Sequence, residues 1–72
     1  MSEIGANIPG SIIKVLVGKG DAVKVGQPIA IIEAMKMETN VIATRDGVIE
    51  KVCVSEGDSV KSGQLVAVLE AE

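Results

Sequence analysis

Residues 10–34 read GSIIKVLVGKGDAVKVGQPIAIIEA, and residues 47–71 read GVIEKVCVSEGDSVKSGQLVAVLEA. A shift of 37 residues relates the two segments, and 14 of their 25 aligned positions are identical. Two copies of one supersecondary unit commonly pack around a pseudo-two-fold axis, because each copy then buries its apolar face against the other. The repeat therefore predicts a symmetric scaffold. Residues 35–46, between the copies, have no counterpart in this alignment.

The length and composition predict one small domain, residues 1–72, that is stabilised by aliphatic packing. Hydrophobic residues make up 47% of the chain, which contains no Phe, Tyr or Trp. One cysteine excludes an intrachain disulfide, and the absence of histidine argues against a metal site. Because Cys53 has no histidine to activate it, we expect a reduced thiol without a catalytic role.

The composition also argues against two classes of partner. Proteins that bind single-stranded nucleic acid usually present aromatic side chains, and a net charge of −3 does not attract phosphates. No apolar run is long enough to cross a bilayer, and no signal peptide opens the sequence. We therefore expect a soluble, cytoplasmic protein that binds no nucleic acid and does not insert into a membrane.

Short runs of Val and Ile alternate with polar residues, and Gly, Asp, Asn and Pro interrupt them, which is typical of an all-β sandwich or barrel. Eight short strands, enough for two small sheets, are expected at Ile4–Ile8, Ser11–Val17, Ala22–Val25, Pro28–Ala34, Met37–Ala43, Gly47–Val54, Ser59–Lys61 and Gln64–Glu70.

Two local features recur in both copies. The pairs Gly20-Asp21 and Gly57-Asp58 combine a residue that tolerates positive φ with a carboxylate that can accept hydrogen bonds from nearby backbone N–H groups, so each pair predicts a tight turn. Ile12 lies three residues before Val15, which breaks the alternation and predicts a β-bulge repeated in the second copy.

Lys36 lies in the segment between the copies. A short link without Gly or Pro joins the strand that ends near Ala34 to the strand that begins at Met37, so a tight hairpin over residues 33–39 is expected. A type I turn is the simplest choice, because its central residues need no positive φ. Lys36 then projects from the tip, either as an ordinary solvated charge or as an attachment point for a carried group.

The residues around Lys36 favour the attachment point. Met35 and Met37 flank the lysine, and at least one of them must be exposed at a hairpin tip, where packing does not account for it. A soft apolar pair beside an amine is a suitable contact surface for a modifying enzyme. Glu33 and Glu38 place carboxylates within reach of the tip.

The segment Glu33-Ala34-Met35-Lys36-Met37-Glu38 resembles the attachment motif of biotinyl domains, the biotin carboxyl carrier family. The resemblance extends over almost the whole chain. It is closest to the C-terminal biotinyl domain of pyruvate carboxylase and to the carrier domains of biotin-dependent decarboxylases. The sequence has no room for the thumb insertion of some acetyl-CoA carboxylase carriers.

The resemblance implies a flattened barrel, or barrel-sandwich hybrid, of two four-stranded antiparallel sheets. It implies that biotin is amide-linked to Lys36 as a swinging arm that carries CO2, and that the domain itself catalyses nothing. The implied partners are a biotin protein ligase, a biotin carboxylase, and a carboxyltransferase or decarboxylase. In the ligase complex, recognition would fall on Glu33, Ala34, Met35, Met37 and Glu38.

The sequence is also compatible with three other interpretations. A lipoyl domain shares this fold and an exposed hairpin lysine, but its acceptor lysine usually follows Asp and precedes a small residue. A barrel-sandwich interaction module could use the hairpin for docking, with Lys36 unmodified. An enzyme with a Schiff-base lysine is the weakest alternative, because such lysines need desolvation or a cationic neighbour and Lys36 lies beside Glu33 and Glu38.

Overall fold

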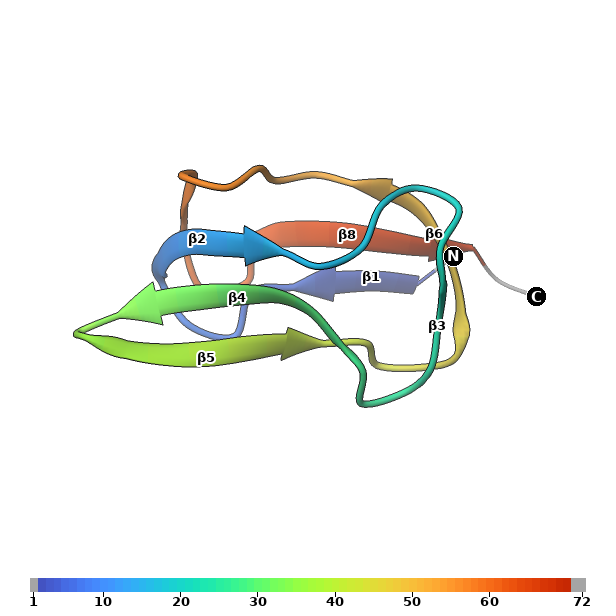
Figure 1. Ribbon diagram of the computed structural model, residues 1–72, viewed down its shortest axis with the longest axis horizontal. Coiled ribbons are helices and arrows are strands. Elements are labelled where there is room, and N and C mark those ends of the chain that lie inside the picture. Colours follow the sequence, from blue (N-terminus) through green and yellow to red (C-terminus); the bar gives the residue numbers. More distant parts are fainter. Residues whose placement is uncertain (1, 71–72) are drawn as a thin grey trace.

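The computed structural model describes residues 2–70, which form eight β-strands and no helix (Figure 1). The all-β prediction is confirmed, and each expected strand overlaps an observed one. The strands are β1 (Ser2–Gly5), β2 (Gly10–Val15), β3 (Ala22–Val23), β4 (Pro28–Ala34), β5 (Met37–Ile42), β6 (Gly47–Val52), β7 (Ser59–Val60) and β8 (Leu65–Glu70).

The first strand lies earlier in the chain than the sequence predicted. It pairs with β8 only as far as Gly5, and the next residue, Ala6, donates its N–H to the carbonyl of Gln64 in the turn before β8. The chain then crosses to β2 through Pro9, which has no N–H to offer a neighbouring strand. Residues 6–9 are therefore a connection, and part of it reaches the lysine hairpin.

The strands form two four-stranded antiparallel sheets. The first sheet has the order β1-β8-β6-β3, and the second has the order β5-β4-β2-β7. The short strands are exchanged between the copies, because β3 of the first repeat pairs with β6 of the second and β7 of the second pairs with β2 of the first. This exchange ties the two halves into one barrel-sandwich.

The internal symmetry reaches further than the sequence repeat indicated. In the second sheet Ile32 pairs with Thr39, and the same shift of 37 residues gives the pair Leu69–Ser2 of the first sheet. Strand β5 is therefore the equivalent of β1. The expectation that residues 35–46 lack a counterpart is wrong for most of that segment. None of the four strand residues 39–42 is identical to its equivalent in 2–5, so the sequence could not reveal the match.

The repeated turns and bulges are confirmed in both halves. Gly20 and Gly57 adopt φ of 93° and 95°, and the carboxylate of the following aspartate accepts a hydrogen bond from a backbone N–H three residues before it, at 2.8 Å in each half. The register shifts after Ile12 in the β2–β4 pair and after Ile49 in the β6–β8 pair, as the repeated bulge required.

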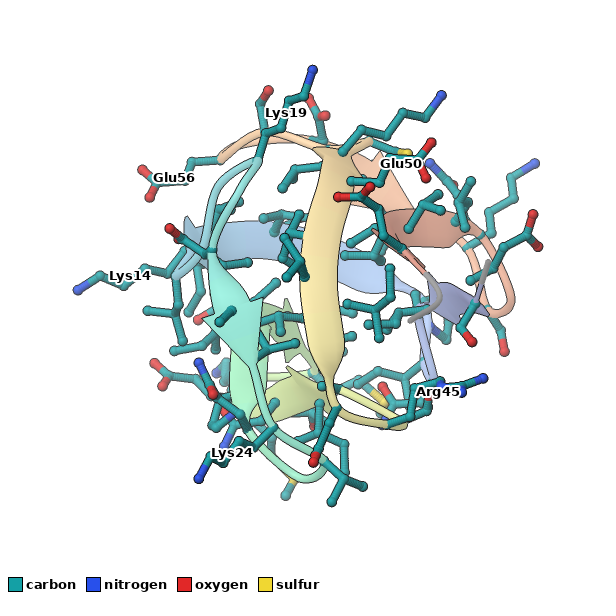
Figure 2. All side chains as sticks on the ribbon, turned by 90° about the vertical axis from the view of Figure 1, so that its right-hand side faces the viewer. Lys14, Lys19, Lys24, Arg45, Glu50 and Glu56 are labelled. Carbon is teal, nitrogen blue, oxygen red and sulfur yellow. The ribbon has the colours of Figure 1, made fainter. Side chains whose placement is uncertain are left out.

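Aliphatic side chains from both sheets fill the interior, while the labelled lysine, arginine and glutamate side chains point outward (Figure 2). Among the described residues no polar or charged side chain is buried. Burying one large aliphatic side chain contributes roughly 1.5–3 kcal/mol, so this core accounts for the fold without a disulfide or a metal. The largest fully buried side chains are Ile4, Ile12, Ile29, Ile32, Ile49, Leu69, Val41 and Val66.

The molecule is elongated, 36 Å by 18 Å by 18 Å, and its two ends differ (Figure 1). The β4–β5 hairpin projects from one end beyond the neighbouring turns, and β1 begins and β8 finishes towards the other. The pseudo-two-fold axis (the dyad) that relates the two halves also exchanges these ends. The β4–β5 pair is joined by a turn at one end, whereas the equivalent β8–β1 pair is not joined at the other. We call them the lysine end and the terminal end.

Candidate functional site: the lysine hairpin

The β4–β5 hairpin holds Lys36 at its tip. The two strands pair without interruption from Ala30 opposite Val41 to Ala34 opposite Met37, so only Met35 and Lys36 remain for the turn. The inner part of the hairpin is anchored by the core residues Ile32 and Val41. A two-residue link on two anchored strands fixes where the lysine backbone lies.

The turn is not the type I turn that the sequence predicted. Met35 and Lys36 adopt φ of 53° and 66°, and positive φ at both central residues is the pattern of a type I′ turn. Type I′ matches the right-handed twist of paired strands, whereas type I would splay them apart. Strand pairing therefore overrides the local preference of two non-glycine residues. The left-handed conformation costs each of them roughly 1–2 kcal/mol of conformational free energy.

The exposure of the flanking methionines agrees with their predicted place at the tip. Met35 is 95% exposed and Met37 is 70% exposed, so neither side chain contributes to the core. Lys36 is also exposed, and its amine is open to a reacting partner. Large apolar side chains left in water at the tip of an anchored hairpin are typical of a contact surface.

The remaining predicted site residues divide between the two faces of the hairpin. Glu33 and Glu38 are exposed and directly opposite each other in the register, so two like charges share one face. Like charges in this position are mildly destabilising. Ala34 is half-buried and lies opposite Met37 on the other face. The hairpin thus has an acidic face and an apolar face.

The apolar face borders a groove that the sequence analysis did not predict. The groove has a volume of about 330 Å³ and is lined by Ile8, Pro9, Ala34, Met35, Met37 and Thr39. Ile8 and Pro9 come from the β1–β2 connection, far from the hairpin in sequence. The sequence analysis assigned Ile8 to the first strand, so its place in the groove became evident only from the position of the connection beside the hairpin.

Other kinds of site are not found in residues 2–70. No group of three or more potential metal ligands comes together there, and Cys53 is an exposed free thiol. The described part of the chain also contains no helix that is long and apolar enough to span a membrane. The lysine hairpin and its groove are therefore the candidate site.

Comparison with known proteins identifies the family. The protein family described as "Biotin-requiring enzyme", which groups biotin and lipoyl domains, matches residues 1–69. The chain belongs to this family. The biotinyl resemblance of the attachment segment, and the barrel-sandwich fold it implied, are thereby confirmed at the level of the family.

The curated relatives include a pyruvate carboxylase and a biotin carboxyl carrier protein. The chain is 55% identical over 47 residues to pyruvate carboxylase of Staphylococcus aureus, which covers 65% of the chain and 4% of that protein. It is 52% identical over 42 residues to the biotin carboxyl carrier protein of Streptococcus mutans, which covers 58% of the chain and 32% of that protein. The chain thus matches only a part of these relatives.

Two solved structures, a carboxylase and a lipoyl domain, superpose closely on this chain. The urea carboxylase of Kluyveromyces lactis superposes with a TM-score of 0.90 at 38% identity, over 96% of this chain and 6% of that one. The lipoyl domain of the 2-oxoglutarate dehydrogenase complex from Azotobacter vinelandii superposes with a TM-score of 0.74 at 32% identity, over 94% and 96% of the two chains. The fold is common to both, so the hairpin tip must distinguish them.

Proposed function

We propose that this chain is a biotin carboxyl carrier domain and that Lys36 bears the biotin through an amide bond. The observation that carries the proposal is the tip itself: an exposed lysine between two exposed methionines in a chain of the biotin-requiring family. The named biotin carboxyl carrier protein and pyruvate carboxylase among the relatives support it.

The hairpin meets the requirements of the attachment reaction. The Lys36 Nζ attacks the carbonyl carbon of the biotinyl adenylate, and the biotin protein ligase takes up the proton that the amine loses. The new C–N amide bond replaces the bond between the carbonyl carbon and a phosphate oxygen. AMP leaves and keeps that oxygen. The amide is uncharged, so the formal net charge changes from −3 to −4.

The domain's own residues hold and present the cargo and carry out no chemistry on it. When bound, biotin supplies a ureido nitrogen on which CO2 is carried. Lys36 provides the tether, which keeps the effective concentration high at each active site and prevents loss by diffusion. The anchored hairpin keeps the tether at one end of the elongated domain.

The partners follow from this role. We propose a ligase that docks on Met35, Met37 and Ala34, with Glu33 and Glu38 on the opposite face helping to orient the tip. A biotin carboxylase would load the arm, and a carboxyltransferase or decarboxylase would unload it. The cytoplasmic location expected from the composition stays a prediction.

A lipoyl carrier is the second candidate, because a lipoyl domain superposes over nearly its whole length. The two candidates differ in which ligase accepts the tip. The chain should be incubated separately with a biotin protein ligase and a lipoate ligase, with the matching cofactor and ATP, and its intact mass recorded.

We expect the biotin ligase to add one biotinyl group and the lipoate ligase to add nothing. The variant Lys36→Arg should remain unmodified, and the matched control Lys14→Arg, on β2 away from the tip, should be modified like the parent chain. Addition of lipoate alone would favour the lipoyl carrier. No addition by either enzyme would favour an unmodified interaction module.

A further inference from the structure

The groove at the lysine end is an apolar surface that the fold does not require. Five of its six lining side chains are apolar, and Thr39 supplies the one hydroxyl. Ile8 and Thr39 are only half-buried, and Pro9 is exposed, so this surface faces water. Apolar side chains gathered at the rim of a domain, outside its core, commonly mark a binding surface.

The equivalent positions at the terminal end show whether the fold requires apolar residues here. The 37-residue shift places Arg45 at the position of Ile8, Asp46 at that of Pro9, and Ser2 at that of Thr39. At the terminal end these residues make polar contacts: the Arg45 guanidinium donates to the Ser2 hydroxyl at 3.0 Å, and the Asp46 carboxylate accepts from a backbone N–H at 2.8 Å. The same backbone positions therefore accept polar residues.

The size and the place of the groove indicate its occupant. About 330 Å³ lies at the lower end of the range for small-molecule sites and is small for a peptide segment. Lys36 lies in the chain between two lining residues, Met35 and Met37, whose Cα atoms are each about 3.8 Å from its own. Any acyl chain joined to the Lys36 amine is therefore held within reach of the groove.

We propose that the groove binds the aliphatic chain of the acyl group carried by Lys36, so that the loaded arm rests against the domain between visits to its partner enzymes. This inference rests on the proposed function. A tethered ligand is present at a high effective concentration, so even a shallow apolar groove is occupied for part of the time. Weak binding also suits a carrier, because the arm must leave the groove to reach an active site.

The lining residues suit an unbranched chain of methylene groups. The thioethers of Met35 and Met37 are flexible and polarisable, so they can adjust around a chain that moves in and out. Ile8 and Pro9 form a stiffer wall across from the hairpin. The hydroxyl of Thr39 is the polar group available to a polar atom at the end of the chain.

Methyl NMR tests the proposal on the chain as it exists. The chain is labelled with ¹³C in its Ile, Met, Ala and Thr methyl groups and fully biotinylated with unlabelled biotin, as verified by intact mass. A chain acetylated at Lys36 is the control, because its amine is neutralised without a long arm. We expect nuclear Overhauser contacts between the arm methylenes and the methyl groups of Ile8, Met35 and Met37, absent from the acetylated chain.

The symmetry provides the matched variants. Ile8→Arg with Pro9→Asp gives the lysine end the residues of the terminal end and should abolish these contacts. Arg45→Ile, at the terminal end, should leave them unchanged. If the double variant fails to fold, Ile8→Ser alone should weaken the contacts. Each variant's fold is checked by its backbone amide spectrum.

Two results would overturn the proposal. In the first, the fully biotinylated chain gives the same methyl spectrum as the acetylated chain; the arm is then free, while the attachment itself stands. In the second, there are no contacts and the double variant slows the ligase, so that the groove belongs to the ligase. A chain that takes up no biotin shows, in the mass measurement alone, that the proposed function has failed.

Discussion

The lysine end and the terminal end have the same backbone plan and opposite surfaces. The dyad relates their strand pairs residue by residue, yet Ile8 and Pro9 line an apolar groove at one end, while Arg45 and Asp46 make hydrogen bonds at the other. Because equivalent backbone positions accept apolar residues at one end and polar residues at the other, the backbone plan does not dictate this difference. We infer that the symmetric positions maintain the scaffold and that the asymmetric ones serve the lysine.

The largest expected effect tests the symmetric part. Ile12 and Ile49 are equivalent and almost completely buried, at 1% and 0% exposure. Truncating either to alanine should cost roughly 2–5 kcal/mol, through lost apolar burial and the cavity left behind. Urea unfolding of Ile12→Ala and Ile49→Ala would measure the two losses, with the milder Ile→Val variants in reserve. A large loss at one site and a small one at the other would show that the halves are not energetically equivalent.

A smaller effect is expected at the two equivalent turns. Gly20 and Gly57 have positive φ, and an added Cβ at either site would meet no atom within 4 Å, so only backbone strain opposes a side chain there. Gly20→Ala and Gly57→Ala should each cost about 1 kcal/mol or more. Thermal melts of both variants provide the measurement. Alanine tolerated at one glycine only would show that the turns differ in solution.

The turn at the lysine end has no equivalent within residues 2–70, and a substitution there should stabilise the domain. Met35 adopts positive φ, which asparagine tolerates better than methionine. We expect Met35→Asn to raise the free energy of unfolding by up to about 1 kcal/mol while slowing biotinylation, because an exposed thioether is lost. Unfolding curves and initial rates with the ligase measure the two effects. An unchanged or lower stability would contradict the strain argument.

The smallest effect on stability is expected for the change that alters recognition most. Met35→Asp combined with Met37→Ala should shift modification from biotin towards lipoate, because these side chains present the lysine to the ligase. Aspartate also tolerates the positive φ of position 35, and exposed side chains away from the core usually alter stability by less than about 0.5 kcal/mol, so the melting temperature should not fall. A large drop would instead show that the methionines pack against the groove and help to hold the hairpin.

The sequence predicted what depends on repeated local patterns. The strands, the Gly-Asp turns and the paired bulges followed from residue types that recur at one spacing. The turn type at Lys36 could not be predicted in this way. The twist of the anchored strands determines it, and the types of the two turn residues do not. The equivalence of β5 and β1 was also missed, since dyad-related residues there share a position and not an identity.

The site was predictable in the same uneven way. The Met-Lys-Met segment is contiguous, so the sequence displays it directly. The side of the groove formed by Ile8 and Pro9 depends on a contact with hairpin residues 25 to 31 positions away in the chain, and a single sequence offers no local pattern for such a contact. The sequence alone did not identify Arg45 and Asp46 as the equivalents of Ile8 and Pro9, because the aligned repeat began only at Gly10.

Mapping the modified residue tests the central claim most directly. The full chain is co-expressed with a biotin protein ligase, digested, and analysed by tandem mass spectrometry across all six of its lysines. We predict a biotinyl group on Lys36 and unmodified side chains at Lys14, Lys19, Lys24, Lys51 and Lys61. Biotin on any of those five, or a folded chain with no biotin on Lys36, would contradict the assignment of the lysine end as the attachment site.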